Sequence, residues 1–148
     1  MAMNQDLRRF VAEYERAFPG EVVRVADVVG LEHDVMAVVL EYERRRRWPI
    51  LLFERVRGHE IPIVANVVAS RRALAFALGV PEAELAAEYA RRIKERIKPV
   101  VVPEAPFRHR VITGDAVDLA TLPIPLYFPG DAGRYLTAGM LVARDPDT

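Results

Sequence analysis

The chain has 148 residues, 51% of them hydrophobic, and its 21 basic and 21 acidic side chains give a formal net charge of zero. This length suits one domain, or one domain with part of another, and the apolar content argues against intrinsic disorder. Balanced charge gives no general attraction to nucleic acid or to an anionic membrane. Because there is no cysteine, disulfides, thiolate metal sites and cysteine nucleophiles are excluded.

No apolar run approaches the ~18–20 residues that cross a bilayer, so we expect no membrane span. The first residues, MAMNQDLRRF, contain no apolar stretch of the kind found in secretory signals. Together with the lack of cysteine, which fits a reducing compartment, these features predict a cytoplasmic protein.

The first half of the chain alternates between helical and strand patterns. Apolar residues recur at helical spacing after Asn4, the expected cap, and Pro19-Gly20 ends this helix. The elements expected next are a strand over 21–27, a helix from about Glu32 into the arginines 44–47, and a short buried strand over 49–54.

A β-hairpin and two helices are expected to follow. The hairpin pairs the buried strand with a strand over 61–68, around a turn at 57–60. Ser70 is a good cap for a helix over 71–78, and Gly79 ends that helix in the left-handed conformation. A further helix begins at Pro81 and is expected to run to about Ile97.

The last third of the chain is interrupted by prolines and has a β-rich pattern. The segment 103–106 (PEAP) predicts a boundary between a compact α+β unit at 1–103 and a β-rich unit that begins at 104–148. In the second unit we expect strands over 109–113 and 135–143, with a short extended piece over 117–119. A strand and turn should lead to a partner strand, so we expect this unit to be incomplete at Thr148.

The most obvious charge run is Arg44–Arg47, followed by Trp48. One interpretation is a phosphate or nucleic-acid contact with a stacking aromatic side chain. The other is a solvated helix end, where cations oppose the negative end of the helix dipole, and the neighbouring glutamates and zero net charge favour it.

The remaining candidates do not assemble a catalytic site. His33, His59 and His109 are far apart and lack the paired spacing of zinc ligands, and His33-Asp34 fits a helix start. No GxGxxG, Walker or GxSxG motif is present. The turn at 130–133 (GDAG) is either an anion-binding nest of backbone amides or a plain turn.

The order of several segments resembles the UbiD-like (de)carboxylases, which use prenylated FMN (prFMN). Asp6-Leu7-Arg8 is similar to the start of the family's first helix. PILLFERVRG (49–58) and IPIVANVVASRRALAFALG (61–79) resemble its next two elements. The most specific similarity covers 117–148, where VDLATLPIP is followed by GDAGRYLTAG and DPDT. Each piece is weak alone, but their collinear order makes chance similarity implausible.

The resemblance implies a three-part enzyme. It would have an N-terminal α/β domain, a flavin-reductase-like split β-barrel that holds the cofactor, and a C-terminal oligomerisation domain. Such enzymes remove or add CO2 on aromatic or α,β-unsaturated carboxylic acids. There prFMN is the electron sink, and a divalent metal, commonly Mn2+, bridges the protein and the cofactor phosphate, often with K+. The implied partners are a small carboxylic acid and either further copies of the chain or its missing remainder.

This sequence departs from the family in what it lacks. The family's metal ligands and acid/base residue follow the DPDT turn, so no catalytic or metal-binding residue can be assigned up to Thr148. Thr137 is the residue that the resemblance places toward the cofactor pocket, although an ordinary strand position fits it equally. Gly139 permits either a close approach of backbone to ligand or a β-bulge.

Two hypotheses follow. In the first, the chain is the N-terminal part of a UbiD-like decarboxylase, is inactive alone and binds no cofactor by itself. In the second, it is a non-catalytic α/β interaction module, or a split subunit, whose edge strand at 135–143 pairs with another chain.

Overall fold

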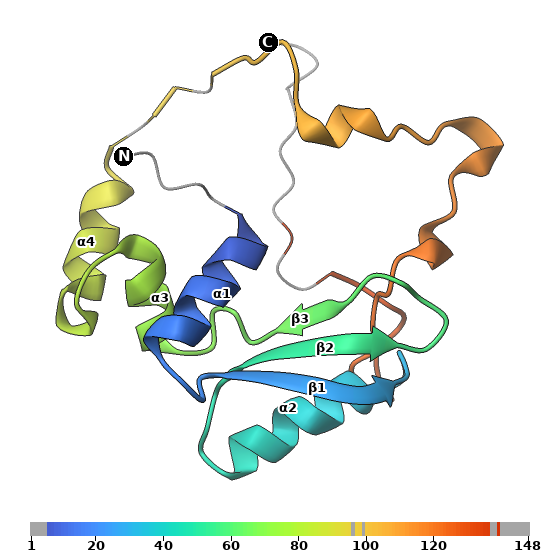
Figure 1. Ribbon diagram of the computed structural model, residues 1–148, viewed down its shortest axis with the longest axis horizontal. Coiled ribbons are helices and arrows are strands. Elements are labelled where there is room, and N and C mark those ends of the chain that lie inside the picture. The colour runs from blue at the N-terminus through green and yellow to red at the C-terminus, as the bar shows by residue number, and fades with distance from the viewer. Residues whose placement is uncertain (1–5, 96, 99, 137–138, 140–148) are drawn as a thin grey trace.

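The computed structural model describes residues 6–95, 97–98, 100–136 and 139, and it has the mixed α/β fold that the sequence predicts (Figure 1). The helices are α1 (Leu7–Ala17), α2 (Asp34–Arg44), α3 (Arg71–Leu78) and α4 (Leu85–Arg92). The strands are β1 (Val22–Val29), β2 (Ile50–Val56) and β3 (Ile63–Ala65). Four short 3-10 helices complete the secondary structure: η1 (Glu82–Glu84), η2 (Pro106–His109), η3 (Gly114–Ala116) and η4 (Leu119–Thr121).

The strands form one sheet in the order β1-β2-β3. β1 and β2 are parallel and are joined through α2, with a register shift between Val25 and Val28. β2 and β3 are antiparallel, which confirms the predicted hairpin, but β3 spans three residues instead of the expected 61–68. The strand ends early because the chain turns at Asn66, whose φ of 63° is left-handed.

Helices cover both faces of the sheet (Figure 1). On one face α1 and α3 pack around Val11, Tyr14 and Ile50. On the other face α2 packs through Val35 onto Leu51 and Phe53. Adjacent residues of β2 thus enter opposite layers, which explains why this strand is a continuous apolar run rather than an alternating one.

Four helix ends can be compared with the sequence predictions. Ser70 Oγ accepts a hydrogen bond from Ala73 N, and Gly79 ends α3 with a φ of 70°, so both predictions are confirmed. Asp6, rather than Asn4, caps α1 by accepting from Arg9 N, and Asn4 lies outside the described residues. α4 ends at Arg92 instead of near Ile97. Ile97 is 90% exposed, so no packing supports a longer helix.

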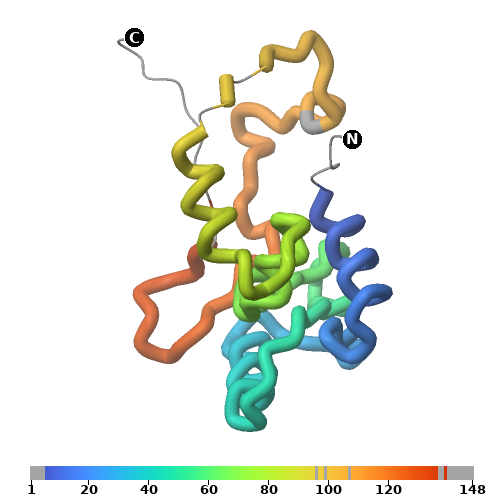
Figure 2. Tube along the Cα trace, turned by 90° about the vertical axis from the view of Figure 1, so that its left-hand side faces the viewer, coloured from blue at the N-terminus to red at the C-terminus, as the bar shows by residue number. Residues whose placement is uncertain are grey.

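Beyond α4, the described residues form no strand. The strand predicted over 109–113 is wrong: His109 ends η2, and the residues after it are irregular. The short piece at 117–119 is extended at Val117 and Asp118 and then enters η4. Residues 100–117 loop away from the sheet (Figure 2), where no neighbouring strand is available to complete a ladder. In the strand expected over 135–143, Tyr135, Leu136 and Gly139 are irregular, and the other residues lie outside the described part.

The buried hydroxyl of Tyr14 lowers the free energy of unfolding, and a substitution can remove this hydroxyl. Tyr14 is 1% exposed, and its hydroxyl has no hydrogen-bond partner among the described residues. A buried polar group without a partner keeps its desolvation penalty. We therefore expect Tyr14→Phe to raise the free energy of unfolding by about 1 kcal/mol in a urea titration.

Tyr89→Phe is the matched control, because Tyr89 is 60% exposed. It should change the free energy of unfolding by less than about 0.5 kcal/mol. A loss of stability in Tyr14→Phe would contradict the structure and reveal a partner for the buried hydroxyl.

The pKa of Glu88 on α4 gives a pH-dependent prediction. Hydrogen bonds from Arg91 and then Arg92 lower it from its ordinary value of 4.5 to about 2. Because the folded chain has the lower pKa, the stabilisation from Glu88 is complete above about pH 4.5 and is lost as the pH falls toward 2. Carbon-detected NMR should place the titration midpoint of this carboxyl near pH 2. The double variant Arg91→Gln/Arg92→Gln should raise the midpoint, and an unchanged midpoint would contradict the assignment.

Candidate functional site

The carboxyl ends of parallel strands are where open α/β sheets most often bind ligands. Here that position is next to the loop between β1 and α2, residues 30–33, and the turn after β2, residues 57–59. A later part of the same chain lies against it: residues 121–134, which we call the strap, return to the arrowhead ends of β1 and β2 (Figure 1). The sequence analysis did not predict this contact.

Backbone groups hold the strap in place. Leu126 N donates to Leu31 O at 2.8 Å, and His33 N donates to Leu126 O at 3.0 Å. These bonds form an isolated parallel bridge between Glu32 and Leu126. His59 Nδ1 lies 3.2 Å from Thr121 O, which ties the start of the strap to the turn after β2. The strap thus extends the hydrogen bonding of the sheet beyond the end of β1.

The loop that receives the strap has an unusual conformation at the start of α2. His33 occupies the N-cap position with a left-handed φ of 67° and makes no capping bond with its side chain. Its Nε2 is buried and has no partner among the described groups. Asp34 instead reaches back and accepts a hydrogen bond from Gly30 N at 2.7 Å. The predicted His33-Asp34 helix start is therefore confirmed, and it also shapes the surface that the strap contacts.

The second half of the strap forms a closed turn. Asp131 Oδ2 accepts from Phe128 N at 2.9 Å, and Asp131 N donates to Phe128 O at 3.1 Å. The rings of Tyr127 and Tyr135 lie 5.7 Å apart. Loss of hydration and the nearby Asp131 carboxylate raise the pKa of the Tyr135 hydroxyl. Asp131 thus bonds back to Phe128 through both its backbone and its side chain, which favours the plain turn of the two alternatives for 130–133.

Of the two predicted cofactor-facing residues, Thr137 lies outside the described part of the chain and Gly139 lies within it. Among the described residues, a Cβ added at Gly139 would meet Leu136 Cβ at 3.9 Å. Leu136 is 70% exposed and Tyr135 is 45% exposed. The assignment of both residues stays a prediction.

The described residues do not fit a metal ion. Within this part of the chain, no group of three or more histidine, aspartate or glutamate side chains lies close enough to bind one.

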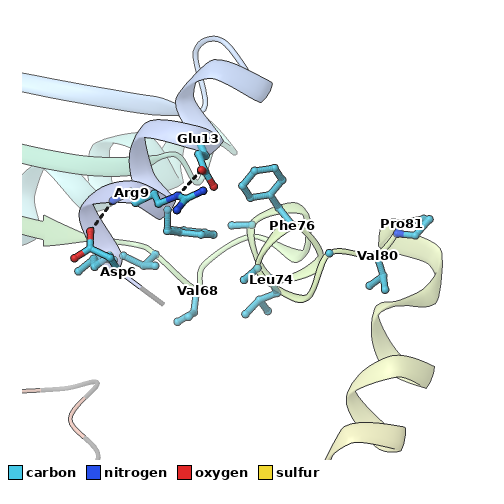
Figure 3. Close-up of a pocket in the computed structure, with 14 residues that line it drawn as sticks. Asp6, Arg9, Glu13, Val68, Leu74, Phe76, Val80 and Pro81 are labelled. Carbon is cyan, nitrogen blue, oxygen red and sulfur yellow. Dashed lines mark hydrogen bonds and ion pairs between the residues drawn. The ribbon is translucent and has the colours of Figure 1, made fainter. Parts of the chain in front are cut away.

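An apolar groove of about 860 Å3 lies between α1 and α3 (Figure 3). Val68 and Leu74 are exposed in it, and Phe76 forms part of its wall. Arg9 pairs with Glu13 at 2.6 Å on its rim. The sequence analysis missed this groove because α1 and α3 are far apart in the chain, and only their packing creates it.

Arginines of the run at 44–47 form ion pairs, a hydrogen bond and a cation–π contact with other groups of the same chain. Glu41 forms ion pairs with Arg44 at 3.2 Å and Arg45 at 2.6 Å. Arg47 donates to Gly20 O at 3.0 Å and lies over the Tyr42 ring. These contacts favour the interpretation as a solvated helix end over a nucleic-acid site.

Asp34 is expected to stabilise the loop that receives the strap. Asp34→Ala removes the acceptor for Gly30 N and a negative charge from the first turn of α2, so it should cost about 1–2 kcal/mol of unfolding free energy. Asp27→Ala, at an exposed position on β1, is the matched control and should cost less than about 0.5 kcal/mol. Equal stability losses in the two variants, measured by urea denaturation, would contradict this role.

Comparison with known proteins identifies the family. The model of the 3-octaprenyl-4-hydroxybenzoate carboxy-lyase (UbiD) N-terminal domain matches residues 15–112, and the model of the Rift-related domain of the same enzymes matches residues 98–148. The chain therefore belongs to the UbiD family, as the sequence resemblance predicted.

Solved structures agree with this assignment. Two are of the UbiD-class enzyme HmfF from Pelotomaculum thermopropionicum, one an evolved dimeric form in complex with prFMN and the other in complex with FMN. Each has a TM-score of 0.80 and 32% sequence identity, over 95% of this chain. The match covers 32% of the first structure's chain and 31% of the second's.

Two curated relatives are uncharacterised proteins. One, in the cooM 5′ region of Rhodospirillum rubrum, is 33% identical over 97% of this chain and 30% of its own length. The other, from Aquifex aeolicus strain VF5, is 28% identical over 97% of this chain and 34% of its own length. The chain thus spans about a third of the length of the relatives it matches. In the part that the structure describes, no helix has the length and apolar character needed to cross a membrane.

Proposed function

We propose that the chain is the N-terminal part of a UbiD-like non-oxidative (de)carboxylase that uses prFMN and acts on aromatic or α,β-unsaturated carboxylic acids. The observation that carries this proposal is the order of the two family matches, in which the Rift-related domain follows the N-terminal domain along one chain. The HmfF structures that contain prFMN or FMN support the flavin.

In this proposal the α/β unit at 1–103 is a scaffold, and the segment from 104 begins the flavin-binding domain. Bound prFMN would supply the electron sink for loss or gain of CO2. Thr137 and Gly139 would face it, and the exposed Leu136 would offer apolar contact. Mn2+ and K+ would be bound by the proposed whole enzyme. Among the described residues, no group of three or more histidine, aspartate or glutamate side chains could hold a metal ion. The proposed whole enzyme is a cytoplasmic homo-oligomer.

The proposal predicts that the 148-residue chain alone does not decarboxylate. The purified chain would be incubated with prFMN, Mn2+, K+ and a panel of aromatic and unsaturated acids, and substrate loss followed by chromatography. The longer polypeptide encoded by the same reading frame, tested in parallel, should turn over at least one acid. Turnover by the 148-residue chain would contradict the predicted inactivity, and a longer polypeptide that is inactive on every acid would contradict the proposed function.

A split subunit or interaction module is the second candidate, and one observation favours it. Several apolar side chains beyond α4 are exposed, including Val100 at 83% and Val101 at 94%. Apolar surface of this kind is expected to be covered by other polypeptide. A stop codon directly after Thr148, together with a stable complex with a second chain, would favour this candidate over the first.

A further inference from the structure

Arg134 is the last residue of the strap and binds two distant parts of the chain at once. Its Nη1 lies 2.9 Å from Ile124 O and 3.2 Å from Leu31 O. Its Nη2 lies 3.5 Å from Glu32 Oε1. The two hydrogens of one guanidinium nitrogen thus bind two carbonyl groups, one on each of the two segments that the Glu32–Leu126 bridge joins.

One acceptor of Arg134, Leu31 O, is held by a second bond. Leu31 O also accepts from Leu126 N, so its two lone pairs are used by the strap backbone and by the arginine. Pro125, between the two bonded parts of the strap, is buried. Because Leu31 O is held by the strap backbone, it gives the guanidinium of Arg134 a defined anchor at the end of β1.

The residues directly after Arg134 are those that the proposed function places beside the cofactor. The Tyr135 ring packs at a tilt against the Tyr127 ring of the strap, and Leu136 and Gly139 follow in the chain. A shift of the strap away from the carboxyl end of β1 would move the start of this segment with it.

We propose that Arg134 is a positioning residue, which clamps the strap to the end of β1 and thereby positions Tyr135 and Leu136, where the chain enters the proposed flavin-binding segment. The inference rests on the proposed function, since it needs that segment to contact the flavin. It adds a residue that acts by bonding to the N-terminal unit at Leu31 and Glu32, without contact with the flavin itself.

The arginine side chain suits this role better than lysine. Its planar fork directs hydrogens in fixed directions, so it can serve Leu31 O and Ile124 O together and still face Glu32. A flexible ammonium keeps the charge but not the fixed geometry.

The test uses the protein as its gene encodes it, with Arg134→Gln compared with wild type. Arg45→Gln is the matched control, because it removes an exposed arginine ion pair at the far end of α2. Hydrogen exchange of the Leu126 and His33 amides reports on the strap, and quenching of FMN fluorescence reports on flavin affinity. We expect Arg134→Gln to speed both exchanges by about tenfold and to weaken FMN binding by about tenfold, with Arg45→Gln unchanged in both.

Each readout can overturn a different part of the inference. Unchanged exchange in Arg134→Gln would show that the arginine does not clamp the strap. Faster exchange with unchanged FMN affinity would show that the clamp does not position a flavin-binding segment. If the wild-type protein binds no FMN, the proposed function and the positioning role both fail, whereas the exchange rates still decide the clamp.

Discussion

The structure depends on β2, which is paired on both edges and covered on both faces. Ile50 enters the layer formed with α1 and α3, whereas Leu51 and Phe53 enter the layer formed with α2. Parallel pairing with β1 requires a crossover connection, and α2 provides it. That crossover brings the loop at 30–33 next to the end of β2. The position of the candidate site is therefore a consequence of the central strand.

At this end of the sheet the chain satisfies its own backbone groups with a distant segment. Loops that leave polar backbone groups without partners are costly where water is excluded, and the strap supplies partners for Leu31 and His33. The N-terminal α/β unit and the residues that precede Tyr135 are thereby joined by hydrogen bonds as well as by the chain. The match to the Rift-related domain covers residues 98–148, so these bonds tie part of that matched segment to the sheet.

The segment between α4 and the strap contrasts with this arrangement. Its valines and isoleucines are largely exposed, and the strand predicted over 109–113 does not form. A strand pattern describes which side chains suit a sheet, but the ladder itself needs a neighbouring strand. The relatives are about three times as long as this chain. Family membership was visible in the sequence, most specifically over 117–148, because motifs survive in sequence whether or not their partners are present.

The sequence alone determined the elements whose causes are local. Ser70 and Gly79 mark the ends of α3 through capping chemistry, and the apolar run of β2 predicts a strand buried on both faces. It also predicted the family through the order of its motifs. Only the tertiary structure decided the parallel pairing of β1 with β2, the groove between α1 and α3, and the contact of Arg134 with Leu31. These contacts join residues that are far apart in the chain, and such contacts depend on which surfaces meet when the sheet and helices pack, a choice that no local pattern encodes.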